Sequence, residues 1–164
     1  HFDFIAIPII KKRLRMDTSK VILDEARPKL TRHLSERAQQ KVGQNVNLLG
    51  EVVLGNGEAD HRYHHYLEAL EAPDINYISV KISGIYAQTH ALNYEESFPE
   101  LVKRMSALYQ KAMDFPHTDE NGVKRAKFVN LDMEEYKDSH FTLRLFKTVL
   151  SKPEFKNYSA GIVV

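Results

Sequence analysis

Three short segments of the chain alternate between aliphatic and polar residues, and this two-residue period constrains the fold more than any other feature. Successive side chains of a strand point to opposite faces, so each segment has one apolar face and one polar face. The segments lie near residues 45–51, 75–83 and 126–132, and the apolar run at 160–164 predicts a fourth strand. Helical patterns separate them, so we expect strands joined by helical crossovers, which form a parallel sheet.

The helical patterns lie before and between the strands. One covers residues 23–40, where apolar residues recur at four-residue spacing on a polar background. Others cover residues 58–70 and 138–150, and the sequence from Ser97 to Glu100 predicts the capping box that opens a further helix. Residues 115–123 are rich in proline, aspartate, asparagine and glycine and predict a polar turn.

The polar faces of the strands distinguish between two kinds of parallel sheet. Strands of an open doubly wound sheet are covered on both faces and tend to be apolar throughout. In a barrel only the outer face meets helices, and the inner face carries polar groups near the carboxyl ends of the strands. Glu51, Lys81 and Asp132 lie near such ends, on the side opposite the aliphatic residues. The pattern favours a barrel with these three groups converging at its mouth, and the alternative for each is a charge that simply meets solvent.

The predicted fold is α/β: the N-terminal half of a (β/α)8 TIM-type barrel, preceded by a helical segment. A complete barrel has eight βα units and typically about 250 residues, whereas these 164 residues hold about four parallel strands. We expect residues 1–43 to form an N-terminal segment with an amphipathic helix, and residues 44–164 to form the first half of the barrel, truncated at the fourth strand. Because the first residue is His1 rather than Met, we expect an internal cut there.

Composition argues against several other functions. A net charge of +1 gives no global field that would attract nucleic acid. The absence of cysteine excludes disulfides and thiolate catalysis, and no apolar run reaches the roughly 18 residues of a membrane helix. His61, His64 and His65 are spaced along one helical segment but lack the order of zinc peptidases, so a solvated face is favoured and no metal site is predicted. The basic run at 11–15 is likewise interpreted as solvated.

The strand segments carry motifs that resemble the first three strand motifs of the proline dehydrogenase family, in order and spacing. They are Val46-Asn47-Leu48-Leu49-Gly50-Glu51, Ile78-Ser79-Val80-Lys81-Ile82-Ser83 and Val129-Asn130-Leu131-Asp132-Met133-Glu134-Glu135. The stretch at 142–164 looks like the third helix and fourth strand of that family. The resemblance covers about residues 20–164 and is closest to bacterial enzymes, including bifunctional ones that carry an aldehyde dehydrogenase behind the barrel.

The resemblance implies a flavin enzyme in which FAD takes a hydride from the ring carbon beside the nitrogen of L-proline, giving 1-pyrroline-5-carboxylate. Lys81 matches the family lysine that pairs with the substrate carboxylate. Asp132 matches the aspartate near the substrate amine, where a carboxylate can bind the ammonium. Glu51 resembles a glutamate that orients the substrate-binding arginines of the family, and Met133 would touch the flavin.

Further expectations follow from the same resemblance. It implies a quinone-type electron acceptor and a cytoplasmic protein that, at full length, contacts the inner face of the membrane peripherally. Later flavin-binding residues and an arginine pair of the family pattern have no counterpart in these 164 residues, so we expect the chain alone to be inactive. The alternative hypothesis is a non-catalytic βα module that serves as a binding or assembly surface. Flavin content and proline oxidation by the full-length protein distinguish the two.

Overall fold

The computed structural model describes residues 3–18, 22–23, 27–49, 55–87 and 93–163. Contacts divide the chain into two compact units, residues 1–43 and 44–164. The first unit holds the helices α1 (Asp3–Thr18) and α2 (Arg27–Gln39). Sequence analysis did not anticipate α1, whose residues 11–15 are exposed. No helix in the described ranges combines the length and apolarity needed to cross a membrane.

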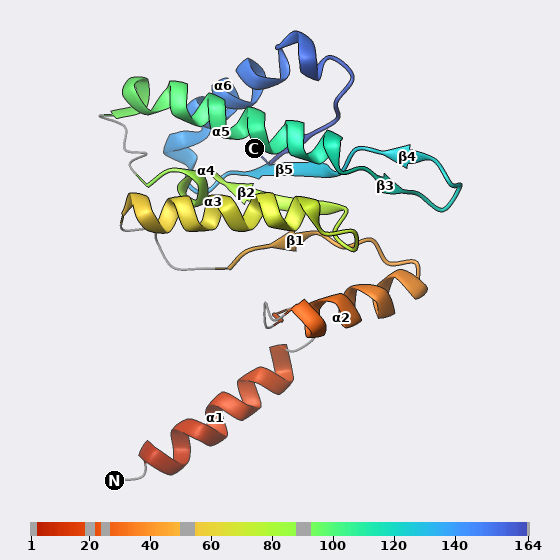
Figure 1. Cartoon of the computed structure of the whole chain (residues 1–164). Helices are drawn as coiled ribbons and strands as arrows, with labels where there is room; N and C mark the ends of the chain where they lie inside the picture. Colours follow the sequence, from red (N-terminus) through yellow and green to blue (C-terminus); the bar gives the residue numbers. More distant parts are fainter. Residues whose placement is uncertain (1–2, 19–21, 24–26, 50–54, 88–92, 164) are drawn as a thin grey trace. The chain divides into compact units, whose positions relative to one another are not determined.

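The second unit is built on one parallel sheet of four strands in the order β1-β2-β5-β6 (Figure 1). The strands are β1 (Val46–Asn47), β2 (Tyr77–Lys81), β5 (Phe128–Asp132) and β6 (Gly161–Ile162). Each neighbouring pair is parallel. Each strand pairs with the next one along the chain, apart from β3 (His117–Thr118) and β4 (Lys124–Arg125), which form a separate hairpin. The prediction of about four parallel strands is confirmed.

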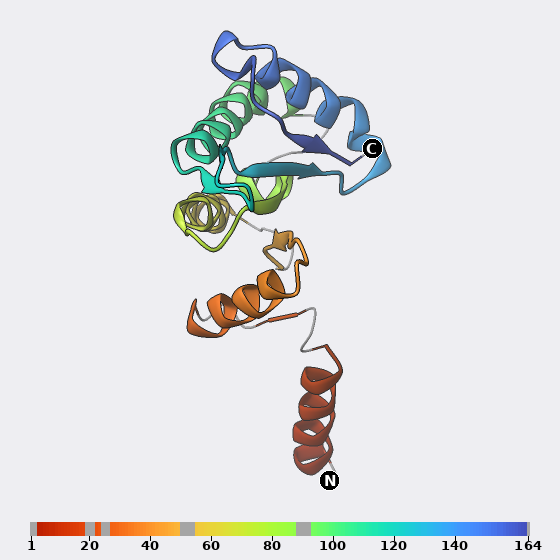
Figure 2. The same cartoon turned by 90° about the vertical axis from the view of Figure 1, so that its right-hand side faces the viewer.

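Three helices cover the aliphatic face of this sheet. They are α3 (Asn56–Glu71), α5 (Tyr94–Asp114) and α6 (Ser139–Leu150), and Figure 2 shows them arranged around the strands. The covered side chains of the two central strands are at most 1% exposed: Ile78, Val80, Val129 and Leu131. Burial of one such side chain contributes about 1.5–3 kcal/mol, so this face holds the sheet against its helices. The opposite face carries the polar residues.

β2 ends earlier than the sequence predicts. The predicted strand at 75–83 continues through Ser83, whereas the backbone becomes helical at the short helix α4 (Ile82–Ile85). The backbone N–H of Ser83 donates to the Glu134 carboxylate rather than to a neighbouring strand. The turn therefore begins immediately after Lys81 and leaves that side chain at the end of the strand.

The outer strands are short. The predicted strand at 45–51 is present at Val46–Asn47 only, where it pairs with β2, while residues 50 and 51 lie outside the described residues. The predicted strand at 160–164 is present at Gly161–Ile162, and residue 164 again lies outside them. Each outer strand pairs on one side within the described part of the chain, and short edge strands are usual where the ladder has one neighbour.

One local prediction was wrong in position, and another was correct for the turn but did not include the strands beside it. α5 begins at Tyr94, so Ser97 lies inside the helix, where its hydroxyl donates to the Tyr94 carbonyl instead of capping the first turn. The predicted polar turn at 115–123 contains the start of an antiparallel hairpin, β3 (His117–Thr118) and β4 (Lys124–Arg125). Asp119 organises its turn, because one carboxylate oxygen accepts two backbone N–H groups.

Candidate active site

Lys81 and Asp132 are register partners at the last paired position of β2 and β5. Neighbouring strands lie about 4.8 Å apart, so the two backbones are as close as a parallel sheet allows. Both side chains are half-buried. They lie on the same face as Ser79 and Asn130, the register pair two residues earlier, which are 1% and 7% exposed. The structure thus brings two of the three predicted ionisable groups together.

The charges of this pair are open to a third molecule. One Asp132 oxygen accepts a hydrogen bond of 2.5 Å from the Asn130 side chain. The other Asp132 oxygen has no hydrogen bond from a described residue and is available to a ligand. Within the described part of the chain, neither Lys81 nor Asp132 forms an ion pair. An ammonium and a carboxylate at one strand end, not neutralising each other, can bind a ligand that carries both charges.

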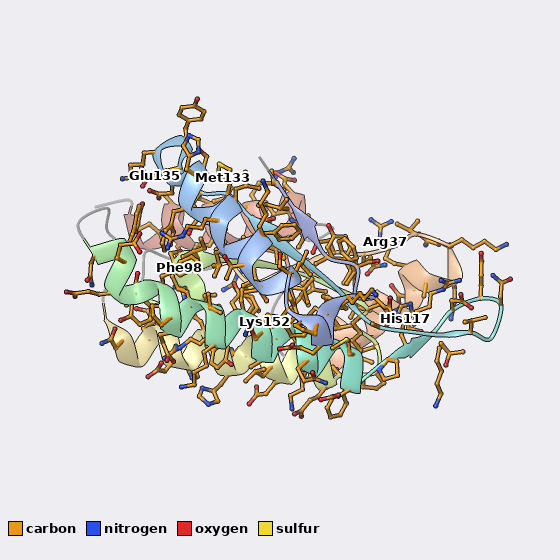
Figure 3. The ribbon with its side chains drawn as sticks, turned by 90° about the horizontal axis from the view of Figure 1, so that it is seen from above. Arg37, Phe98, His117, Met133, Glu135 and Lys152 are labelled. Carbon is orange, nitrogen blue, oxygen red and sulfur yellow. The ribbon has the colours of Figure 1, made fainter. Side chains whose placement is uncertain are left out.

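The remaining predicted site residues are placed less fully. Glu51 lies outside the described residues, so its convergence with the pair stays a prediction. Met133 follows Asp132 directly and is half-buried. Figure 3 shows Met133 and Glu135 at one end of this unit and His117 at the opposite end. Met133 is therefore at the carboxyl end of the sheet, together with the charged pair.

Glu134 is a site residue that sequence analysis missed. Its two carboxylate oxygens bind one residue of another loop: the Ser83 N–H donates at 3.1 Å and the Ser83 hydroxyl at 2.7 Å. The loop after β5 is thereby joined to the turn after β2. The signal available in the sequence is the Ser83-Gly84 pair, which is unfavourable for a strand interior and could have predicted a turn.

Tyr66 supports the same turn from the outer side. It is 2% exposed, its hydroxyl is hydrogen-bonded to the backbone of Lys81, and a β-carbon at Gly84 would lie 3.0 Å from the phenol oxygen. Burial raises the pKa of Tyr66 to about 12; the Lys81 backbone opposes the shift, and the charges of Glu134 and Asp132 add to it. The phenol is therefore neutral, and its buried ring packs against the residues that end β2.

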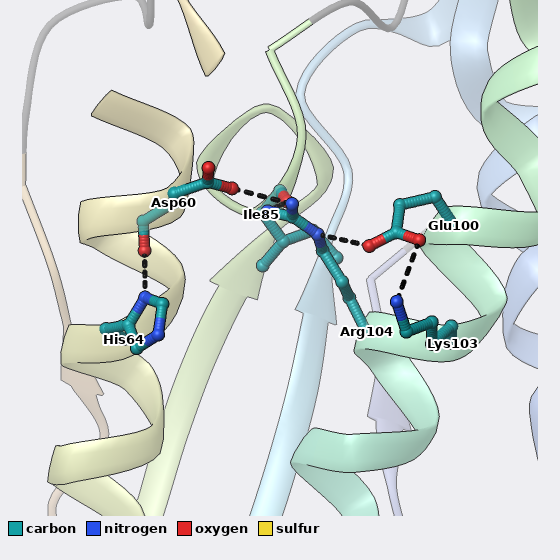
Figure 4. Close-up of polar contacts among 6 residues, drawn as sticks. All are labelled: Asp60, His64, Ile85, Glu100, Lys103 and Arg104. Carbon is teal, nitrogen blue, oxygen red and sulfur yellow. Dashed lines mark hydrogen bonds and ion pairs between the residues drawn. The ribbon is translucent and has the colours of Figure 1, made fainter. Parts of the chain in front are cut away.

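Arg104 fixes the far end of the turn (Figure 4). It donates to the Ile85 carbonyl at 2.8 Å, and it pairs with Asp60 of α3 at 2.6 Å and with Glu100 of α5 at 3.0 Å. Although burial opposes the charge, the hydrogen bonds to Glu100 and Asp60 raise the pKa of Arg104. The residues that follow Lys81 are therefore held by two helices.

A small pocket opens beside Asp132. Its lining residues are Ile82, Tyr94, Asp132, Glu134, Asp138, Phe141 and Thr142. The Tyr94 hydroxyl donates to the Asp138 carboxylate, and its ring stacks on Phe141 at a centroid distance of 4.0 Å. Desolvation, followed by the contact with Asp138, raises the pKa of Tyr94 to about 12. Three carboxyl groups line the pocket, and no basic residue is among the described residues of its lining.

Comparisons with known proteins give a family match and similar solved structures. A family model described as proline dehydrogenase matches residues 30–164. The structure of proline utilization A from Corynebacterium freiburgense is 38% identical, with a TM-score of 0.79, over 93% of this chain and 15% of that one. Proline utilization A from Bdellovibrio bacteriovorus is 28% identical, with a TM-score of 0.79, over 98% of this chain and 18% of that one. Curated proteins gave no match.

Similarity to a third structure supports the fold only, because the sequence identity is low. Proline utilization A from Bradyrhizobium japonicum, as a D778Y mutant, is 22% identical with a TM-score of 0.59, over 72% of this chain. The chain spans less than a fifth of the length of the first two structures. Its four parallel strands and their helices are part of a (β/α)8 barrel, as the polar inner faces of the strands predict.

Proposed function

The chain belongs to the proline dehydrogenase family, and from that premise we propose that it supplies the substrate-binding side of an FAD-dependent enzyme that oxidises L-proline to 1-pyrroline-5-carboxylate. The observation that carries this proposal is the Lys81–Asp132 register pair. Two opposite charges, held side by side and unpaired with described residues, are complementary to the two charges of one amino acid.

The charges of proline are carried by adjacent groups, a carboxylate on the α-carbon and an ammonium within the ring. The Lys81 ammonium binds the carboxylate, and the free oxygen of Asp132 binds the ring ammonium. The Asn130 amide holds the other oxygen and fixes the direction of the carboxylate. Because both groups are half-buried, these attractions are stronger than they would be in bulk water.

The proposed oxidation removes a hydride from the ring carbon and a proton from the ring nitrogen, leaving a carbon–nitrogen double bond. FAD, when bound, supplies the two-electron acceptor. Asp132 accepts a hydrogen bond from the ring N–H, which orients the nitrogen and favours loss of its proton. Lys81 holds the carboxylate at a fixed distance from the reacting carbon.

One residue at this end of the sheet, Met133, is suited to contact a flavin. The Met133 side chain is half-buried directly after Asp132, and a polarizable thioether suits contact with an aromatic ring. We propose Met133 as the flavin contact of this chain. By family likeness, the electron acceptor is a quinone-type molecule, and the full-length protein is cytoplasmic with peripheral contact at the inner face of the membrane.

The test uses the full-length protein that contains this chain. Purified, it should be yellow and should reduce a quinone-like dye when L-proline is added. Pyrrolidine, which is proline without its carboxylate, is the matched control and should react far more slowly because Lys81 then has no partner. A colourless protein that is inert to L-proline would refute the proposed function and favour a non-catalytic module.

A further inference from the structure

The paired part of β2 and β5 stops at the two residues that the proposed chemistry needs. Lys81 and Asp132 form the last register pair, and beyond them one backbone enters α4 while the other enters a loop. The end of a ladder is where strands separate most easily. Something beyond the ladder must therefore hold the spacing of these two side chains if they are to bind one small molecule.

We propose that Glu134 is the positioning residue that sets the spacing of Lys81 and Asp132, by tying its own loop to Ser83. Glu134 lies two residues after Asp132, and Ser83 lies two residues after Lys81. The two hydrogen bonds between them continue the strand pairing by one step, with a side chain in place of the backbone. For its catalytic consequence this inference rests on the proposed function.

The geometry of the contact is specific. Each carboxylate oxygen of Glu134 accepts one donor, and both donors belong to Ser83. A two-point contact fixes orientation as well as distance, and charged acceptors make stronger bonds than neutral ones. Glu135, the next residue, pairs with Lys137 at 2.8 Å, a contact within its own loop. Glu135 therefore serves as a matched control with the same charge and a similar exposure.

Loss of the two Glu134–Ser83 hydrogen bonds should weaken the binding of ligands that contact both charges more than the binding of ligands that contact one. L-Proline contacts Lys81 and Asp132 together, so its affinity depends on their spacing. Cyclopentanecarboxylate keeps the ring size and the carboxylate but has no ammonium, so it engages Lys81 alone. A defect in spacing weakens the first ligand selectively, whereas a general loss of structure would weaken both.

The experiment compares Glu134→Ala, Ser83→Ala, their double variant and Glu135→Ala in the full-length protein. We expect Glu134→Ala to raise KM for L-proline about tenfold and to change inhibition by cyclopentanecarboxylate less than about twofold. Ser83→Ala keeps its backbone donor and should raise KM about threefold. The double variant should equal Glu134→Ala, because both changes remove one contact. Glu135→Ala should match the wild type.

A second measurement separates this inference from the proposed function. Hydrogen–deuterium exchange of the peptide that contains Ser83 should be faster in Glu134→Ala than in Glu135→Ala, whether or not the protein oxidises proline. Equal exchange in the two variants, or equal weakening of both ligands, would overturn the positioning role. If Glu134→Ala does not fold, Glu134→Gln keeps one acceptor oxygen and should raise KM about threefold; an unchanged KM there would also overturn it.

Discussion

Lys81 and Lys127 stand at opposite ends of the two central strands, and the protein uses them differently. Lys127 precedes β5 by one residue and is 1% exposed, with its ammonium donating to the Ala72 carbonyl. Its own carbonyl accepts a 3.0 Å hydrogen bond from the Tyr158 hydroxyl. Lys81 ends β2, is half-buried and has no ion-pair partner among the described residues.

Under the proposed function, the two lysines separate stability from chemistry within one sheet. At the amino end, Lys127 is held by contacts within the protein. Tyr158, which donates to its carbonyl, belongs to an aromatic cluster in which Tyr109 lies 4.9 Å from Tyr158 and 5.7 Å from Phe155 between ring centroids. Burial raises the pKa of both tyrosines, so they are neutral. At the carboxyl end, charges are held in place but left available. Parallel barrels generally divide their two ends in this way.

The sharpest way to break this comparison is at Asp132. We expect Asp132→Ala to lower kcat/KM for L-proline about 1,000-fold, because the ring ammonium loses its partner and its proton acceptor. Flavin absorbance and thermal stability should stay close to the wild type, since the charge belongs to the open end. Asp132→Asn, which keeps the shape without the charge, should be intermediate. Turnover at the wild-type rate in Asp132→Ala would remove this residue from the site.

The opposite pattern is expected at Lys127. Replacement by Ala opens a cavity and removes one of the two donors to the Ala72 carbonyl, which also accepts the Ile75 N–H, so we expect the free energy of unfolding to fall by about 3 kcal/mol. Lys127→Met keeps most of the volume and should lose less. Denaturant unfolding of the full-length protein measures the change. In protein that remains folded, kcat and KM should be unchanged, and a selective loss of activity would contradict the division between the ends.

Lys81→Met removes the lysine at the carboxyl end of the central strands and can be compared directly with Lys127→Met at the amino end. We expect KM for L-proline to rise about 30-fold, which corresponds to about 2 kcal/mol of lost carboxylate binding. The free energy of unfolding should change little, because the ammonium has no described partner to lose. Steady-state kinetics with L-proline and the dye measure the effect. A KM within twofold of the wild type would show that another cation binds the carboxylate.

The smallest effect is expected at Tyr66, the prop beneath the turn. Tyr66→Phe should lower the free energy of unfolding at neutral pH by about 1 kcal/mol, through loss of the bond to the Lys81 backbone. Because burial raises the pKa of Tyr66 from 10.0 to about 12, folding favours the neutral phenol. The stabilisation is complete below pH 10 and is lost as the pH rises towards about 12.

The wild-type advantage over Tyr66→Phe should therefore shrink across that interval, as denaturant unfolding at several pH values would show. A constant difference from pH 7 to 12 would mean that the phenol titrates normally.

Much of the fold followed from local patterns. The two-residue period of the central strands places Lys81 and Asp132 on one face, because a regular strand leaves no other choice. The order of strands and helices then dictates a parallel sheet, and both inferences use neighbouring residues alone. Similarly, the stripes of α5 and α6 are regular enough to predict which faces are buried.

The features that escaped prediction depend on contacts between distant segments. Ser83 leaves the strand because a carboxylate 51 residues away takes its N–H. α5 begins at Tyr94, where the ring stacks on Phe141 of α6 and the hydroxyl reaches Asp138, two residues far away in the sequence. The hairpin at β3 and β4 depends on Asp119, whose carboxylate also binds Arg125 at 2.5 Å. No periodic pattern carries such information.

Gly161 gives β6 an influence on the site that its two residues would not otherwise have. A β-carbon at this position would overlap the Asn130 side-chain oxygen and lie 2.9 Å from the Phe128 ring. Any larger residue must turn the Asn130 amide, which is the donor to Asp132. The orientation of the Asp132 carboxylate thus depends on Gly161 having no side chain, because only then can the Asn130 amide keep its position. A change at residue 161 would therefore mimic an active-site mutation while touching no ligand.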